Sequence, residues 1–179
     1  MSDSPRTTLV IGGARSGKSR HAQALAEGLA PRRLFIATAQ PFDNEMRDRI
    51  AHHQADRDSS WTTVEAPIAL PAAIRAHGNG AQVVLVDCLT LWLSNLLLAD
   101  ADPDAAGDDL IAATAAASAP IVFVTSEVGY GIVPDNALAR RFRDAAGRLN
   151  QCLAATCDAT DLVVAGIPLR LRGAHQGSR

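Results

Sequence analysis

The eight residues Gly12-Gly13-Ala14-Arg15-Ser16-Gly17-Lys18-Ser19 decide the fold of this 179-residue chain, because they fit the pattern G-x-x-x-x-G-K-S. They follow an apolar run, Thr7 to Ile11, which is typical of a buried strand. They lead directly into Lys18 to Leu29, where the apolar residues have helical spacing. A strand, a glycine-rich loop and a helix in this order predict a phosphate-binding loop (P-loop).

Each position of the loop has a mechanical role. The glycines let the backbone turn sharply, so that its N–H groups converge on a phosphate. Lys18 reaches the β and γ oxygens of a triphosphate, Ser19 is a candidate Mg²⁺ ligand, and the helix N-terminus adds partial positive charge. Arg15 is expected to stabilise charge on the transferred group. The predicted phosphate-binding residues are Gly12, Gly13, Ala14, Arg15, Ser16, Gly17, Lys18 and Ser19.

Short apolar runs alternate with helical stretches along the rest of the chain. The expected strands are 34–37, 61–65, 83–87, 121–125 and 161–165, with another near Leu169, and the expected helices are 43–54, 68–76, 90–98, 104–117 and 136–156. This order predicts an α/β fold, the three-layer P-loop NTPase (RecA-like) architecture, with a mostly parallel sheet and helices on both faces. The chain is expected to form a single domain over residues 1–179, with 170–179 as a flexible tail.

Composition and charge exclude several classes of function. The net charge of −2 gives no reason to expect a nucleic-acid partner or attraction to an anionic membrane. The most apolar run, Leu89 to Ala99, is too short to span a bilayer, and the N-terminus lacks the pattern of a secretory signal. The chain is therefore expected to be soluble and cytoplasmic, without membrane insertion. Lys18 is its only lysine, which excludes the N/T-K-x-D guanine loop of regulatory GTPases.

A carboxylate, Asp87, closes the clearest buried strand, residues 83–87. P-loop enzymes hold Mg²⁺ through a carboxylate at this position, usually by way of water. Aspartate is also a good helix N-cap, and a helix is expected to follow. Asp87 and Ser19 are thus the candidate metal ligands, with a capping role for Asp87 as the alternative.

Beyond the P-loop, two blocks carry a resemblance to a known family. These are Glu127-Val128-Gly129-Tyr130-Gly131-Ile132-Val133-Pro134 and the following stretch 140–151. With them, the chain resembles the bifunctional adenosylcobinamide kinase/adenosylcobinamide-phosphate guanylyltransferases of cobalamin biosynthesis. The resemblance extends from Leu9 to about Gly166, with its gaps in the alanine-rich middle, 99–119.

The resemblance implies two reactions. Adenosylcobinamide is phosphorylated with ATP or GTP, and GMP is then transferred from GTP, through a GMP–histidine intermediate, to adenosylcobinamide phosphate. It also implies a homo-oligomer (a trimer) and His52 as the nucleophile, while the P-loop and Asp87 predict Mg²⁺ as cofactor. Asp58 stands where the family often has proline, and Ser126 where asparagine is frequent. The implied nucleotide contacts are Ala37, Thr38, Ala39, Ala55, Asp56, Arg57, Asp58 and Glu65. Asp87, singled out from its strand, is also expected to belong to the nucleotide-binding residues.

Helical spacing independently favours His52 over His53 as the nucleophile. At about 100° per residue, His53 shares the apolar stripe of Met46 and Ile50, whereas His52 points roughly 160° away from Ile50. Lys18 and His52 are therefore the expected catalytic residues. The alternatives are a small-molecule P-loop kinase without guanylyl transfer, in which His52 is structural, and a nucleotide-sensing module without turnover.

Overall fold

The computed structural model describes residues 4–40 and 58–173. The strands in these two ranges are β1 (Thr7–Gly12), β2 (Arg33–Ala37), β3 (Trp61–Glu65), β4 (Val84–Asp87), β5 (Ile121–Ser126), β6 (Ala159–Val164) and β7 (Ile167–Arg172). The helices are α1 (Lys18–Leu29), α3 (Leu70–His77), α4 (Leu89–Leu98), α5 (Pro103–Ala116) and α6 (Ala137–Thr156). The expected elements in the described ranges are therefore present, with bounds that differ by two residues or fewer for most of them.

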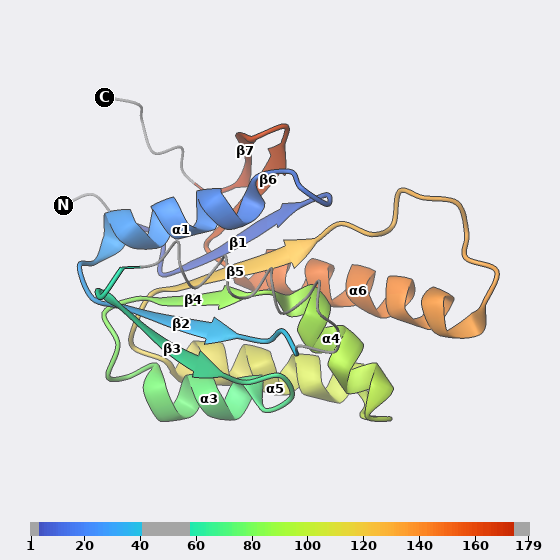
Figure 1. The fold of residues 1–179 in the computed structure, drawn as a ribbon, viewed down its shortest axis with the longest axis horizontal. Coiled ribbons are helices and arrows are strands. Elements are labelled where there is room, and N and C mark those ends of the chain that lie inside the picture. Colours follow the sequence, from blue (N-terminus) through green and yellow to red (C-terminus); the bar gives the residue numbers. More distant parts are fainter. Residues whose placement is uncertain (1–3, 41–57, 174–179) are drawn as a thin grey trace.

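The strands form one sheet in the order β3-β2-β4-β5-β1-β6-β7 (Figure 1). Every neighbouring pair is parallel except the last, in which β7 runs antiparallel to β6. The mostly parallel α/β sheet predicted from the alternation of elements is thus confirmed. Because β1 to β6 run in one direction, the residues that follow their carboxyl ends meet at one edge of the sheet.

Helices cover both faces of the sheet, which gives three layers. Of the described helices, α1 lies on one face, and α3, α4, α5 and α6 cover the other (Figure 1). Side chains alternate between the faces, as they must along a strand. Val10 and Val124 therefore join the core under α1, whereas Leu9 and Phe123 join the core that contains the buried Trp92.

Local chemistry explains where two of the longer helices begin. Asp102 caps α5 by accepting hydrogen bonds from the N–H groups of Asp104 and Ala105, and Pro103 takes the first helical position. Asn136 caps α6 through the N–H of Ala139. Among the helices in the described ranges, none combines the length and apolar character needed to cross a bilayer.

The structure corrects the prediction that a flexible tail begins at residue 170. Arg170 and Arg172 belong to β7, which pairs with β6 as a hairpin. The arginine-rich sequence suggested solvent exposure, but the Arg170 side chain is only 12% exposed because it pairs with Asp161 of β6. Residues 174–179, the rest of the predicted tail, lie outside the described ranges.

Candidate nucleotide-binding site

The predicted P-loop runs from the end of β1 to the start of α1 at the carboxyl edge of the sheet. Gly17 has a φ of 92°, a conformation that L side chains rarely adopt, and it occupies the N-cap position of α1. A β-carbon added at Gly12 would lie 2.5 Å from Ser16 Oγ and 2.6 Å from the Val163 carbonyl oxygen. These two glycines are therefore required by backbone conformation and by close approach, as the motif predicts.

The Lys18 ammonium forms a hydrogen bond within the loop. Lys18 Nζ donates a hydrogen bond to the Gly13 carbonyl oxygen at 3.0 Å. Ser19 follows in the first turn of α1, and this turn, Lys18 to His21, carries no acidic residue. A helix N-terminus with an ammonium, a hydroxyl and no competing carboxylate attracts an anion.

The predicted carboxylates lie along the same edge of the sheet, at different distances from the loop. Ala37 of β2 is in register with both Glu65 of β3 and Asp87 of β4. Only β5 separates β4 from β1, so Asp87 lies near the P-loop. Four strand spacings separate β3 from β1, which places Glu65 about 19 Å away along the sheet. Glu65 is therefore too distant to contact phosphates held by the loop.

The position of Asp87 bears on its two alternative roles. The N-cap residue of α4 is Cys88, so Asp87 is not the residue that caps the helix. Burial raises the pKa of the Cys88 thiol to about 12, an effect that the negative charge of Asp87 increases and the positive charge of Lys18 opposes. Both charges thus act on the same point, between the P-loop and the end of β4. Asp87 thus shares this end of the sheet with Lys18.

Thr38 was expected to contact nucleotide, and in the structure it forms hydrogen bonds within the protein. It is fully buried, and its hydroxyl donates to the Cys88 carbonyl oxygen at 2.7 Å and accepts from the Cys88 N–H at 2.9 Å. The Asn95 side-chain amide donates to the Thr38 carbonyl oxygen at 2.8 Å. Thr38 therefore ties the end of β2 to the segment that follows Asp87. Its neighbours Ala37 and Ala39 are half-buried.

A buried polar network behind the site was not singled out from the sequence. The Thr125 hydroxyl donates to the Asn150 side-chain oxygen at 2.9 Å, and the Ser126 N–H donates to the Thr90 hydroxyl at 2.7 Å. Ser126 is in register with Gly12, so the network holds β5 beside the start of the P-loop. Asn150 was part of a recognisable sequence block, but nothing local to it indicated this role.

Comparison with known proteins identifies the family. A family profile described as "Cobinamide kinase / cobinamide phosphate guanyltransferase" matches residues 8–171. The chain belongs to this cobinamide kinase/guanyltransferase family.

Individual relatives match over nearly their whole length. The chain is 46% identical to the bifunctional adenosylcobalamin biosynthesis protein CobP of Pseudomonas aeruginosa, over 92% of this chain and 96% of the relative. It is 47% identical to the bifunctional adenosylcobalamin biosynthesis protein CobU of Escherichia coli, and 48% identical to that of Salmonella typhimurium. Each CobU match covers 92% of this chain and 98% of the relative.

A solved structure supports the fold. The P4 protein of bacteriophage phi6, solved in complex with ADP, matches with a TM-score of 0.50 at 17% identity. The match covers 92% of this chain and about half, 52%, of P4. At this identity the likeness supports the architecture of the family member described here and nothing about its chemistry.

One of the two departures from the family's pattern now has a structural explanation. The Asp58 carboxylate accepts hydrogen bonds from the Ser60 hydroxyl and N–H, and these bonds hold its pKa below the usual range. The Trp61 N–H also donates to the Asp58 carbonyl oxygen, which begins β3. Asp58 therefore forms a turn without needing the proline that is frequent there.

Several expected site residues lie outside the described ranges. They are His52, Ala55, Asp56 and Arg57. His53, which was expected to be a packed structural histidine, lies outside these ranges as well. The structure therefore places the P-loop and Asp87 at one edge of the sheet with only β5 between their strands, and Ala37 lies on β2 between Asp87 and Glu65. Asp58 precedes β3 and lies toward the opposite edge.

Proposed function

We propose that this protein phosphorylates adenosylcobinamide with ATP or GTP and then transfers GMP from GTP to adenosylcobinamide phosphate, giving adenosylcobinamide-GDP. The observation that carries the proposal is the match of residues 8–171 to the cobinamide kinase/guanyltransferase family, combined with an intact P-loop at the carboxyl edge of a parallel sheet. The triphosphate substrates are consistent with a reaction in the cytoplasm.

The described residues suit the binding and transfer of phosphate groups. Phosphoryl transfer needs positioning and electrostatic stabilisation more than covalent chemistry by the protein. The P-loop N–H groups and Lys18 would hold the phosphates, and Arg15, exposed at the tip of the loop, would stabilise charge on the group in transfer. A hydroxyl of the corrinoid would attack the γ-phosphorus. The bond between the γ-phosphorus and the oxygen that bridges it to the β-phosphate would break, and the nucleoside diphosphate would leave.

The donors beside the loop fit Mg²⁺. Mg²⁺ prefers oxygen ligands and keeps several waters, so one hydroxyl, one carboxylate and the substrate phosphates suffice. Ser19 would bind it directly, and Asp87 would hold its water shell. Among the described residues there is no group of three or more acidic, histidine or cysteine side chains to form an all-protein metal site. When bound, Mg²⁺ would neutralise charge that develops on the phosphates.

Asp87→Asn is expected to lower both rates by about 10- to 100-fold, since it removes the charge that orders the metal's waters while keeping the side-chain shape. Raising Mg²⁺ should recover part of the loss. Titrating each reaction with Mg²⁺ tests this, with thermal unfolding as the control. A variant that is less stable but retains its rate at low Mg²⁺ would show that Asp87 has a structural role only.

For the second reaction we propose His52 as the nucleophile. An imidazole nitrogen would attack the α-phosphorus of GTP, a P–N bond would form, and pyrophosphate would leave. A phosphate oxygen of adenosylcobinamide phosphate would then attack the same phosphorus and release the histidine. The covalent intermediate lets pyrophosphate depart before the corrinoid phosphate enters.

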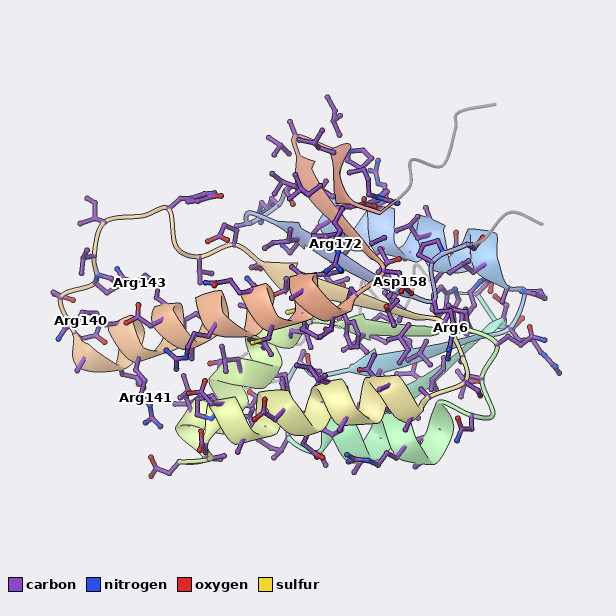
Figure 2. All side chains as sticks on the ribbon, turned by 180° about the vertical axis from the view of Figure 1, so that it is seen from behind. Arg6, Arg140, Arg141, Arg143, Asp158 and Arg172 are labelled. Atoms are coloured by element: carbon purple, nitrogen blue, oxygen red, sulfur yellow. The ribbon has the colours of Figure 1, made fainter. Side chains whose placement is uncertain are left out.

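We also propose a homotrimer, as the family resemblance implies. The loop between β5 and α6 supports self-association, because Tyr130 and Ile132 are 90% and 97% exposed. Arg140 holds the end of this loop against α6 by donating to the carbonyl oxygens of Pro134 and Asp135 (Figure 2). Light scattering after size exclusion should give three times the chain mass. A monomer at micromolar concentration would contradict the proposal.

The proposed function is tested by incubating the purified protein with adenosylcobinamide, GTP and Mg²⁺ and taking mass spectra of the corrinoid over time. We expect a phosphorylated corrinoid first and its GDP derivative second. Accumulation of the phosphorylated product alone would favour the kinase without guanylyl transfer. Triphosphate binding without any product would favour a nucleotide-sensing module.

A further inference from the structure

A buried ionic cluster lies next to the P-loop helix. Asp161 of β6 is 2% exposed, and its carboxylate accepts hydrogen bonds from His21 Nε2 at 2.9 Å and from the Arg170 guanidinium. The three residues come from α1, β6 and β7, and Asp161 and Arg170 face each other in the β6–β7 register. A carboxylate this well buried is costly unless it is paired and hydrogen-bonded, so the cluster depends on all three side chains.

His21 connects this cluster to the phosphate-binding residues. It lies in the first turn of α1, three residues after Lys18, and its backbone N–H donates to the Gly17 carbonyl oxygen at 3.0 Å. Residues three apart on a helix lie on the same side of it. The bond to Asp161 therefore fixes the rotation and axial position of the turn that carries Lys18 and Ser19.

The turn of the same hairpin contacts the P-loop directly. The Gly166 N–H donates to the Ser16 carbonyl oxygen at 2.7 Å, and a β-carbon on Gly17 would lie 3.1 Å from Gly166 Cα. Ala165 and Gly166 have φ values of 52° and 80°, which form the tight turn that presents this N–H. The β6–β7 hairpin thus contacts the P-loop and the first turn of its helix at separate points.

The base of the hairpin is anchored to other elements (Figure 2). The Asp158 carboxylate accepts hydrogen bonds from the Thr7 N–H and hydroxyl at 2.9 and 3.1 Å, at the start of β1. Arg172 donates to the carbonyl oxygens of Ala154 and Ala155 at the end of α6. Because its base is held at β1 and α6, the hairpin can hold the P-loop in a fixed position.

We propose that His21, Asp161 and Arg170 are positioning residues for the nucleotide, through which the β6–β7 hairpin holds the P-loop and Lys18 in the phosphate-binding geometry. The inference rests on the proposed function in one respect, that the P-loop binds triphosphate. None of the three side chains needs to touch the substrate. Their effect is on how tightly the loop holds the phosphates.

The test replaces the His21 side chain and leaves the Asp161–Arg170 pair in place. His21→Ala removes the hydrogen bond. The glutamine side-chain nitrogen can take the place of Nε2, whereas the shorter asparagine places its nitrogen near that of Nδ1. His21→Gln and His21→Asn are therefore a matched pair, similar in chemistry but different in reach. Arg75→Ala is the control, because Arg75 forms an exposed ion pair with Asp109 between α3 and α5.

The measurements are the Kd of GTP with Mg²⁺ by calorimetry, and KM and kcat for each reaction. We expect Kd and KM to rise about tenfold in His21→Ala and His21→Asn, as loss of one charge-assisted hydrogen bond predicts. His21→Gln should restore most of the affinity, and Arg75→Ala should match the wild type. Because binding is weakened in ground and transition states alike, kcat should change much less than KM.

Lys18 offers a second readout, since it is the only lysine in the chain. Its acetylation rate, followed by mass spectrometry of its peptide, should be slowed by GTP in the wild type. In His21→Ala, the same protection should require about tenfold more GTP, in proportion to the change in Kd.

The outcomes separate this inference from the function on which it rests. Wild-type protein that fails to bind ATP or GTP would overturn both. Wild-type binding that is equalled by His21→Ala would overturn the inference alone, even if the variant unfolds at a lower temperature. Equal affinities in His21→Gln and His21→Asn, both below that of the wild type, would also overturn it, since reach to Asp161 would then have no effect.

Discussion

Lys18→Ala is expected to lower the rates of both phosphorylation and guanylyl transfer by about 10²- to 10³-fold, the usual cost of removing one preorganised group that stabilises transition-state charge. Lys18 is the first residue of α1, and its ammonium lies within 3.0 Å of the Gly13 carbonyl oxygen, inside the loop that holds the phosphates. No other lysine is present to substitute for it. Steady-state kinetics of each reaction measured separately would test this.

Lys18→Arg is the matched control for charge. Arginine keeps the positive charge but replaces a compact ammonium with a longer, planar fork, so we expect little recovery. Both variants should unfold at nearly the wild-type temperature, because the Lys18 side chain is half-buried at the loop and lies outside the core clusters. A near-normal rate of either reaction in Lys18→Ala would indicate a second nucleotide site and contradict a shared P-loop.

His52→Ala is expected to lower guanylyl transfer by on the order of 10⁴-fold or more, as the loss of a covalent nucleophile does elsewhere. Phosphorylation should retain most of its rate, because the corrinoid hydroxyl attacks the γ-phosphorus without a covalent relay. The two rates are measured with adenosylcobinamide phosphate and with adenosylcobinamide as separate acceptors. A parallel loss of both rates would mean that His52 acts in nucleotide binding and not as the nucleophile.

His53→Ala is the matched control. The sequence predicts His53 on the apolar stripe of a helix, so its loss should lower the free energy of unfolding and leave guanylyl transfer in place. The decisive observation is the peptide that carries GMP after incubation with GTP and Mg²⁺. A GMP adduct of undiminished yield in His52→Ala would assign the nucleophile to another residue.

The parts of the site that could be predicted from the sequence are those whose chemistry is local. The P-loop is encoded in eight consecutive residues, and the glycine conformations that it needs follow from their positions. Asp87 was singled out as a candidate metal ligand because a polar residue ends an apolar strand. The helices in the described ranges were placed because their apolar spacing is visible within one segment.

The contacts that were missed join residues far apart in the chain. His21 and Asp161 are 140 residues apart, and their contact depends on the order in which β1 and β6 pair. Neither the strand order nor the β6–β7 register can be read from a single segment. His21 was accordingly unremarkable in the sequence, and Arg170 was assigned to a solvent-exposed tail.

Thr38 illustrates a further limit. The family resemblance placed it among nucleotide contacts, but its side chain is buried and bonded to Cys88. A residue next to a ligand and a residue that positions the backbone next to it look alike in a sequence motif. Only the three-dimensional contacts separate the two roles.

The central claim is that one chain passes GMP from GTP to a corrinoid phosphate through a covalent intermediate. A pulse and chase tests it most directly. The wild-type protein is incubated with GTP labelled at the α-phosphorus and Mg²⁺, freed of nucleotide, and then given unlabelled adenosylcobinamide phosphate. We predict a protein-bound label, stable to alkali and released by acid, that moves into the corrinoid on the chase. Absence of label from the protein, or bound label that does not move to the corrinoid, would contradict the account.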